Sequence, residues 1–284
     1  MRIVNRDPSD QGADYRCEGS TNATSRFTQS AFVLCMAGAF AAGSPALAAL
    51  YDLYDDFDTS GSTSTNLGPD GVWSFQATAG TGTPVALFDG VDPDYWMDDT
   101  SPAWYFPALG PNSTPAISAI TNPNGAANAN WDLDQGDVGF HQLDNTGLVD
   151  IDWTAPQATT IDLTGLIWGA DLSGLADDRP QQVTLSHLDS SETPISTLIG
   201  PTGFETNGGR GNAVSLDYTG LAVSSGDIIR MRVERTGAGD AFGGLVGVQF
   251  AVVPEPGSLV LLASAVAALC YRRWRCRQPM CLTA

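Results

Sequence analysis

The sequence contains no lysine, and its middle contains no cysteine. All thirteen basic residues are arginines, and the five cysteines lie outside residues 49–253, at Cys17, Cys35, Cys270, Cys276 and Cys281. Residues 49–253 therefore have no disulfide framework, thiol nucleophile or cysteine metal site. Their stability must come from an apolar core, which a segment of about 205 residues is long enough to form.

Basic charge is scarce in the same segment. Residues 49–253 contain five arginines and 27 acidic residues, a net charge of −22, and only three of the acidic residues are glutamates. A surface of this sign repels phosphate backbones, so we expect no nucleic-acid partner. The charge suits a secreted and well-solvated protein.

Catalytic residue patterns are also lacking. The sequence has two histidines, His141 and His187, no Gly-x-Ser-x-Gly motif and no His-rich metal spacing. His187 lies in the inward register of an alternating segment, which favours a hydrogen-bonded core or rim imidazole over a catalytic one. A glycosidase needs two carboxylates ~5–9 Å apart, and the sequence cannot select two among so many. We therefore predict that the protein is not an enzyme.

The N-terminal region has the pattern of a secretory signal peptide. Arg26 precedes a twelve-residue apolar run over 31–42, and Ala46-Leu47-Ala48 follows it. A basic residue, a short apolar core and an Ala-x-Ala site predict cleavage after Ala48 by signal peptidase. Residues 1–48 are thus interpreted as a signal helix with an atypical polar extension over 1–25, the alternative being a buried helix.

The C-terminal region contains a short apolar run between a Pro-Glu-Pro tripeptide and four arginines. Pro254, Glu255 and Pro256 predict a polyproline-like strut that joins neither a helix nor a central strand. The apolar run covers fifteen residues, 257–271, whereas a comfortable membrane helix needs ~20. By the positive-inside rule we expect the arginines after it to stay in the cytoplasm: Arg272, Arg273, Arg275 and Arg277.

These three parts together, over residues 254–284, resemble a PEP-CTERM protein-sorting tail, which is also labelled an ice-binding protein C-terminal domain. The resemblance implies a membrane-embedded exosortase that recognises Pro-Glu-Pro and cleaves near it. It also implies a transient stay in the inner membrane, followed by transfer to the cell surface or extracellular matrix of a Gram-negative-type bacterium. No regular Thr-x-Thr ladder supports ice binding, and a plain membrane anchor is the alternative.

Strand patterns dominate residues 49–253. Clusters of Gly, Pro, Asn, Asp and Ser recur every 8 to 15 residues, and no long apolar pattern of helical period is present. In residues 227–235, Ile229, Met231 and Val233 share one face, while Arg230, Arg232 and Glu234 share the other. We predict an all-β extracellular domain, a single antiparallel β-sandwich. Its expected strands are 72–77, 84–88, 103–106, 137–142, 147–153, 159–168, 182–188, 194–199, 213–218, 227–235 and 245–252.

Two stretches of strand, turn and strand are similar to the jelly-roll modules of secreted carbohydrate-binding proteins. They are Leu148 to Leu163, with a Pro corner at Pro156, and Leu221 to Ile229, with a Ser-Gly-Asp turn. The resemblance implies a jelly-roll-like sandwich and, by analogy, one structural calcium ion.

A calcium site is the first candidate among the many aspartates. Asp56, Asp58 and Ser60 form the Asp-x-Asp-x-Ser-Gly opening of a calcium loop, but Leu67 stands where a bidentate Glu is expected. Asp132-Leu-Asp134-Gln-Gly-Asp137 is a further candidate. The alternative is that these are solvated turns, in which Asp bonds the local backbone. No cofactor is required by any of these patterns.

A cluster of aromatic residues is the second candidate. Trp96, Trp104 and Tyr105 lie close together between Pro-rich turns. Rings beside Asp and Asn suit a sugar-binding platform, because they combine apolar stacking with oriented hydrogen bonds. Filling the sandwich core is the alternative, and it is the more usual fate of Trp in β-domains.

Three functions are compatible with these patterns. The first is an exported, non-catalytic surface or matrix protein, structural in role and processed by an exosortase. The second is a carbohydrate-binding module for exopolysaccharide, and the third is a glycan hydrolase.

Overall fold

The computed structural model describes residues 50–78, 86–92, 101–106, 114–121, 131–142, 147–172, 179–236 and 244–255. The chain from Leu47 to Gly257 forms a compact unit. The predicted signal peptide and the sorting tail beyond Glu255 lie outside the described residues, so their predicted helices stay predictions. Within the described ranges, no helix has the length and apolarity that a membrane crossing requires.

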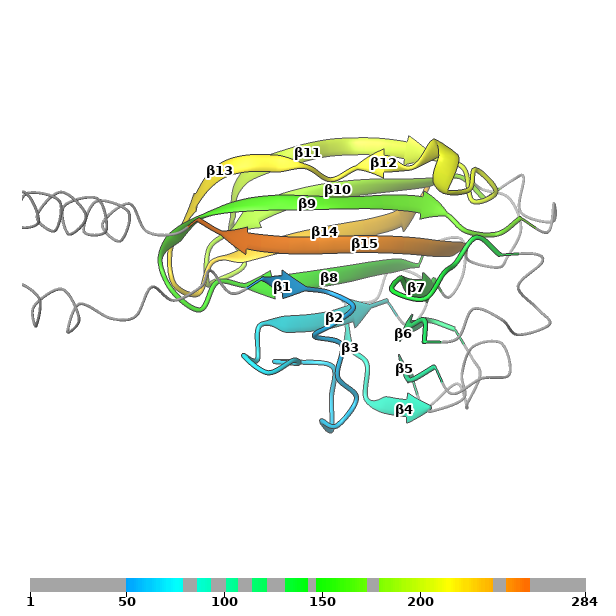
Figure 1. Ribbon diagram of the computed structural model, residues 1–284, viewed down its shortest axis with the longest axis horizontal. Coiled ribbons are helices and arrows are strands. Elements are labelled where there is room, and N and C mark those ends of the chain that lie inside the picture. Colours follow the sequence, from blue (N-terminus) through cyan, green and yellow to red (C-terminus); the bar gives the residue numbers. More distant parts are fainter. Residues whose placement is uncertain are drawn as a thin grey trace, which may run out of the picture. The chain divides into compact units, whose positions relative to one another are not determined.

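The described strands form two antiparallel sheets (Figure 1). Sheet A is nine-stranded, in the order β12-β9-β15-β7-β6-β5-β4, and β1 and β13 also pair with β15 and β9 respectively. Its strands are β1 (Tyr51–Asp52), β4 (Gly90–Asp92), β5 (Ala103–Tyr105), β6 (Ala116–Ala119), β7 (Val138–His141), β9 (Thr159–Gly169), β12 (Val214–Ser215), β13 (Tyr218–Val223) and β15 (Leu245–Pro254).

Sheet B is six-stranded, in the order β11-β10-β14-β8-β2-β3. Its strands are β2 (Trp73–Ala77), β3 (Ala86–Leu87), β8 (Leu148–Thr154), β10 (Gln181–Leu188), β11 (Pro194–Phe204) and β14 (Ile228–Arg235). A short 3-10 helix, η3 (Arg210–Asn212), precedes β12.

The core lies between the inner faces of the two sheets. Along β14 burial alternates residue by residue, and Ile229, Met231 and Val233 are the buried positions, as the sequence pattern predicted. They share one continuous apolar cluster with Val248 and Phe250 of sheet A. The domain is therefore an all-β sandwich, which confirms the predicted fold class.

The chain crosses repeatedly between the sheets. From β7 to β15 the chain changes sheet between consecutive strands, with two exceptions. Strands β10 and β11 form a hairpin within sheet B, and strands β12 and β13 both pair with β9 in sheet A. The four strands β8, β14, β10 and β11 are neighbours in sheet B, and β7, β15, β9 and β13 are neighbours in sheet A. Residues far apart in sequence are thus placed in adjacent strands.

Each predicted strand corresponds to an observed one, with differences at the ends. Strand β11 continues to Phe204, through Pro201, because an edge strand tolerates a residue without an N–H group. Three short strands were not predicted, namely β1, β4 and β6. They have two to four residues each, which is too few for a period of two to be detected.

The end of β15 differs from the sequence-based expectation. Pro254 is the last residue of this central strand and pairs with Ile161. Glu255 donates its backbone N–H to the carbonyl of Thr160, at 2.8 Å. Pro254 therefore takes the alternate position, whose N–H would point away from β9, and loses no ladder bond there. The expectation that the Pro-Glu-Pro tripeptide cannot join a central strand is wrong for Pro254.

Ion pairs cross the outer face of sheet B, between β14 and β8. Arg230 bonds Asp152 through both Nε (2.8 Å) and an Nη atom (2.7 Å), and Arg232 bonds Asp150 in the same way at 2.7 and 2.6 Å. Both aspartates are buried although they face outward. The paired carboxylates and guanidinium groups make this face specific for one strand register.

We expect Arg230→Met to lower the free energy of unfolding by about 3 kcal/mol, because it leaves the buried Asp152 without its bidentate partner. Glu192→Gln removes an exposed partner of the same arginine and should cost no more than about 1 kcal/mol. Urea unfolding of both variants measures the difference. Equal losses would contradict this account of the pair.

Candidate functional site

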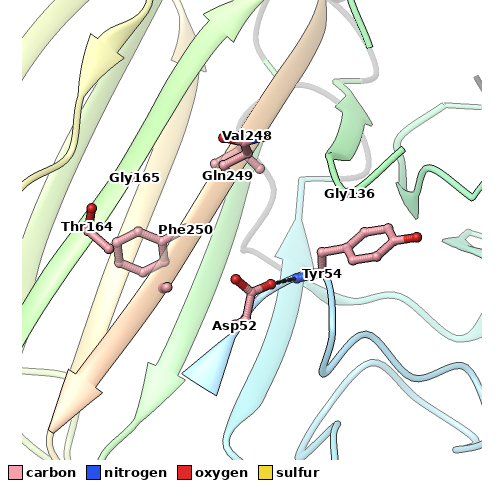
Figure 2. A pocket seen from close by; sticks show the side chains of 9 residues that line it. Asp52, Tyr54, Gly136, Thr164, Gly165, Val248, Gln249 and Phe250 are labelled. Atoms are coloured by element: carbon pink, nitrogen blue, oxygen red, sulfur yellow. Dashed lines mark hydrogen bonds between the residues drawn. The ribbon is translucent and has the colours of Figure 1, made fainter. Parts of the chain in front are cut away.

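A pocket lies on the outer face of sheet A, beside β15. Strands β1 and β7 pair with the same edge of β15, β1 at Ala251–Val252 and β7 at Leu245–Val248, so Gln249 and Phe250 lie between them. The pocket has a volume of about 270 Å³. Figure 2 shows its lining, which consists of Asp52, Tyr54, Gly136, Thr164, Gly165, Val248, Gln249, Phe250 and Ala251.

Strand register places three of these residues in one row. Asp52 of β1 pairs with Ala251, and Ala251 pairs with Thr164 of β9. Side chains of paired residues point to the same face of a sheet. The small Ala251 side chain therefore forms the floor between an aspartate from the start of the domain sequence and a threonine from its middle.

The turn after β1 fixes one wall of the pocket. Oδ1 of Asp52 accepts hydrogen bonds from the backbone N–H groups of Tyr54 (2.9 Å) and Asp55 (3.1 Å), and Figure 2 shows the first of these. Such a turn holds the Asp carboxylate in one orientation. Tyr54 is half-buried and packs partly against the core, so its aromatic ring is a fixed part of the wall.

The part of the lining at Gly136 depends on a buried aspartate, Asp137. Gln249 donates from Nε2 to Oδ1 of Asp137 at 2.9 Å, and the N–H of Asp134 donates to its other oxygen at 2.6 Å. Arg210 pairs with the same carboxylate at 2.5 Å. These bonds hold the turn at Gly136 beside β15, where it borders the pocket.

Arg210 is itself held against Trp168. Its guanidinium carbon lies 4.2 Å from the centre of a Trp168 ring, a cation–π contact. That ring lies across Gly247, where an added Cβ would come within 2.5 Å of it. The indole N–H donates to the carbonyl of Asp132 at 2.7 Å. The segment 131–137 is thereby fixed on the outer face of sheet A.

A second carboxylate lies next to the pocket on the β9 side. Asp217 accepts hydrogen bonds from Ser215, from the Thr164 hydroxyl and from the N–H of Gly165. These bonds lower the pKa of Asp217, with the Ser215 bond as the largest cause. The carboxylate is thus ionised beside the pocket at neutral pH, and it engages the hydroxyl hydrogen of Thr164.

The predicted calcium ligands Asp56 and Asp58 accept hydrogen bonds from protein groups in the structure. Asp58 accepts from the backbone N–H and the hydroxyl of Ser60, both at 2.8 Å, and Asp56 accepts from the Trp73 indole at 3.1 Å. Asp132, Asp134 and Asp137 instead surround Arg210. Among the described residues, no group of three or more His, Cys, Asp or Glu side chains is arranged to hold a metal. A calcium ion elsewhere stays a prediction.

The predicted aromatic platform is not assembled by the residues that the structure describes. Trp104 is 0% exposed, belongs to the core and donates its indole N–H to the carbonyl of Asp58 at 2.8 Å. Tyr105 is half-buried against the smaller apolar cluster that includes Trp168. Trp96 lies outside the described residues. Trp104 therefore has the core role that the sequence left as the more usual alternative.

The two histidines occupy different environments. His187 is buried at the inner face, as its register predicted, and its Nε2 lies 2.9 Å from Oδ2 of the buried Asp227. His141 donates from Nδ1 to the carbonyl of Gln142 at 2.6 Å. Neither residue lines the pocket. The predicted sorting and cleavage residues other than Pro254 and Glu255 lie outside the described residues.

Sequence reasoning did not identify the pocket residues Asp52, Tyr54, Thr164 and Gln249. The alternation that buries Ile161 and Leu163 does place Thr164 on the outer face, and that signal was available. Nothing local connects Thr164 with Asp52, however, because their neighbourhood arises from two separate pairings with β15.

Comparison with known proteins gives only weak similarities. No protein-family model and no curated protein matches the chain. Among solved structures, TmCBM61 in complex with β-1,4-galactotriose is 16% identical, at a TM-score of 0.31, over 49% of this chain and 82% of that one. A family 35 carbohydrate-binding module from Clostridium thermocellum is 15% identical, at a TM-score of 0.26, over 48% and 88%.

An enzyme is among the similar structures as well. Xylanase10C from Cellvibrio japonicus in complex with xylopentaose is 9% identical, at a TM-score of 0.28, over 64% of this chain but 27% of the xylanase. Similarities of this strength assign no ligand and no activity to this chain.

The environment of His141 leads to a pH prediction. Burial lowers the pKa of His141 to about 4, and Arg179 lowers it further, while the bond to Gln142 opposes the shift. In the unfolded chain His141 binds a proton near its ordinary pKa of ~6.5, whereas in the folded state it stays neutral down to about pH 4. The free energy of unfolding therefore falls as the pH drops from 6.5 towards 4. We expect a loss of at most about 2 kcal/mol between pH 7 and pH 5.

Urea unfolding at pH 7 and pH 5 measures that loss, and His141→Gln should make the dependence flatter. NMR titration of the imidazole offers an independent test. Protonation of His141 in the folded protein at pH 6 would contradict the prediction.

Proposed function

We propose that residues 49–253 form a non-catalytic, jelly-roll-like domain that contacts polysaccharide outside the cell. The observation that carries the proposal is the pocket that combines the Tyr54 ring with Asp52, Thr164 and Gln249. Aromatic faces next to a few fixed polar groups suit a sugar, which has both apolar ring faces and hydroxyl groups. The neighbour order β8, β14, β10, β11 and β7, β15, β9, β13 supports the jelly-roll arrangement.

The size and accessibility of the pocket support a small subsite. Its volume of about 270 Å³ is at the lower end of the range of ligand pockets, ~300–1,000 Å³. One sugar unit of a longer chain would occupy it, while the rest of the polysaccharide lies along the outer face. Because Gln249 and Thr164 are both exposed, a polymer reaches the pocket from solvent.

Binding is favoured over hydrolysis by the carboxylates that the pocket contains. Hydrolysis of a glycosidic bond requires two carboxyl groups ~5–9 Å apart on either side of that bond. Within the described residues, the pocket lining contains one carboxylate, Asp52. Asp137 is fully buried and bonded to Arg210 and Gln249. Asp217, beside the pocket, has a pKa lowered by its hydrogen bonds. Neither carboxylate is therefore available to protonate a leaving group.

We further propose that the domain belongs to an exported protein with a PEP-CTERM sorting tail over residues 254–284. The Pro-Glu-Pro motif, the short apolar run and the arginine cluster in the sequence support this proposal. Strand β15 reaches Pro254, so cleavage after the motif would leave every described strand of the sandwich in the released part. Signal peptidase and an exosortase would be the processing partners, and the cell surface or extracellular matrix the destination.

The pocket is tested by Tyr54→Ala, with Tyr218→Ala as the matched control. Tyr218 is a 36% exposed tyrosine on β13 and does not line the pocket. We expect Tyr54→Ala to weaken binding to a responsive polysaccharide about tenfold, because it removes the ring from the wall, while the control stays unchanged. Affinity electrophoresis against a panel of neutral, acidic and amino polysaccharides measures this, with thermal unfolding as a check on folding.

Ala251→Leu provides a second variant, since it fills the floor of the pocket without removing a polar group. Its binding should fall as well. Absence of binding by the unaltered protein to every polysaccharide in the panel would overturn the binding proposal and favour a purely structural role.

The sorting proposal predicts the C-terminus of the mature protein. Mass spectrometry of the protein recovered from the cell surface should find a C-terminal residue in or just after the Pro-Glu-Pro motif, between Pro254 and Ser258, because the membrane run and the arginines would be left behind. An intact chain ending at Ala284 on the surface would contradict processing by an exosortase.

A further inference from the structure

The polar atoms that the pocket offers to a ligand are mainly hydrogen-bond acceptors, which restricts the class of ligand. Two of the pocket's hydrogen-bond donors, the Thr164 hydroxyl and the Gln249 amide nitrogen, are already bonded to other protein groups. The polar atoms left for a ligand are therefore mainly acceptors. From this arrangement we propose that the pocket binds an amino sugar, a unit with a protonated amine, rather than an acetylated or acidic sugar. The inference rests on the proposed carbohydrate-contacting function.

Asp52 is the central acceptor. Its Oδ1 accepts hydrogen bonds from both backbone N–H groups of the turn, so the carboxylate is oriented. Figure 2 shows its other oxygen on the side away from Tyr54. A carboxylate is an acceptor only. A hydrogen bond between a carboxylate and an ammonium is charge-assisted and about twice as strong as a neutral one.

Thr164 and Gln249 also present acceptors. The Thr164 hydroxyl donates to Asp217, and therefore only its oxygen lone pairs are left. Gln249 must direct its amide nitrogen to Asp137, because that carboxylate accepts. Its carbonyl oxygen is then the atom left for a ligand. A ligand rich in donors fits this set.

The charge near the pocket has one sign. The lining contains Asp52 and no arginine, and the neighbouring Asp217 is held ionised by its hydrogen bonds. The nearby Arg210 is bonded to Asp137 and Asp134. A uronate or sulfate group would meet these carboxylates without a cation to balance it, which costs affinity.

Tyr54 favours an amino sugar over a simple amine as the ligand of the pocket. This residue lines the pocket, and Figure 2 shows its ring extending from the turn away from Asp52, toward Gly136. A ligand therefore gains by carrying its amine on a ring that is large enough to reach the tyrosine. A 2-amino sugar within a β-linked chain has this combination, whereas a lysine side chain carries its ammonium on a flexible stem.

The experiment compares three tetrasaccharides of equal length by isothermal titration calorimetry with the full chain. They are a β-1,4-linked glucosamine, its N-acetylated counterpart and a uronate. We expect the glucosamine tetramer to bind at least about tenfold more tightly than the N-acetylated one, because acetylation removes the charge. The uronate should bind most weakly.

Asp52→Asn should abolish that preference while the fold stays intact. The asparagine Oδ1 still accepts the N–H groups of Tyr54 and Asp55, so the thermal midpoint should not change. Asp189→Asn is the matched control, since Oδ1 of Asp189 accepts two backbone N–H groups, from Ser191 and Thr193, in the β10–β11 turn. It removes the same charge at a position that does not line the pocket.

Each outcome decides between the inference and the function on which it rests. Equal binding of the amino and N-acetylated tetramers, or a preference that survives Asp52→Asn, would overturn the inference and leave the carbohydrate function standing. If Asp189→Asn lowers the affinity for the glucosamine tetramer as much as Asp52→Asn does, the preference is general charge attraction and the inference is overturned. The same holds if pentalysine binds as tightly as the glucosamine tetramer. Binding of none of the three sugars would overturn the inference, and the proposed function falls with it only if no polysaccharide of the wider panel binds either.

Discussion

The position of β15 in the middle of sheet A is the constraint on which the site depends. It pairs with β9 along one edge and with β1 and β7 along the other. That arrangement brings Asp52, Ala251 and Thr164 into one row and leaves the space beside Gln249 uncovered. A shift of β15 by one residue would turn the row to the opposite face and place core residues in water. The hydrophobic core therefore fixes the site.

Buried charge gives the same register further support. Asp150 and Asp152 face away from the apolar core and are nevertheless buried, because Arg230 and Arg232 lie over them. On the other sheet, Asp137 is buried beneath Arg210, which stacks on Trp168. Losing a partner in such pairs is costly, so each pair resists a change of register. In this lysine-free domain three of the five arginines serve these contacts.

Features that depend on near neighbours in the chain, such as strand alternation and aspartate turns, could be predicted from the sequence. Alternation along residues 227–235 depends only on the geometry of one strand, and it was confirmed by the burial of Ile229, Met231 and Val233. The inward register of His187 was predicted in the same way. The aspartates of turns behave as expected too, since Asp52, Asp58 and Asp189 bond the backbone next to them. Short elements such as β1 and β6 lack enough residues for a period to show.

The sequence by itself determined the fold class, the strands of the second half and the acidic character of the surface, because these follow from composition and from contacts between near neighbours. Only the tertiary structure decided that Trp104 fills the core, that Asp132 and Asp137 bind Arg210, and that Pro254 ends a central strand. It alone joined Asp52 and Tyr54 to Thr164 and Gln249. Such neighbours arise from pairings between residues 87 and 199 positions apart, Thr164 with Ala251 and Asp52 with Ala251. The register of these pairings is set by the whole core and not by any local pattern.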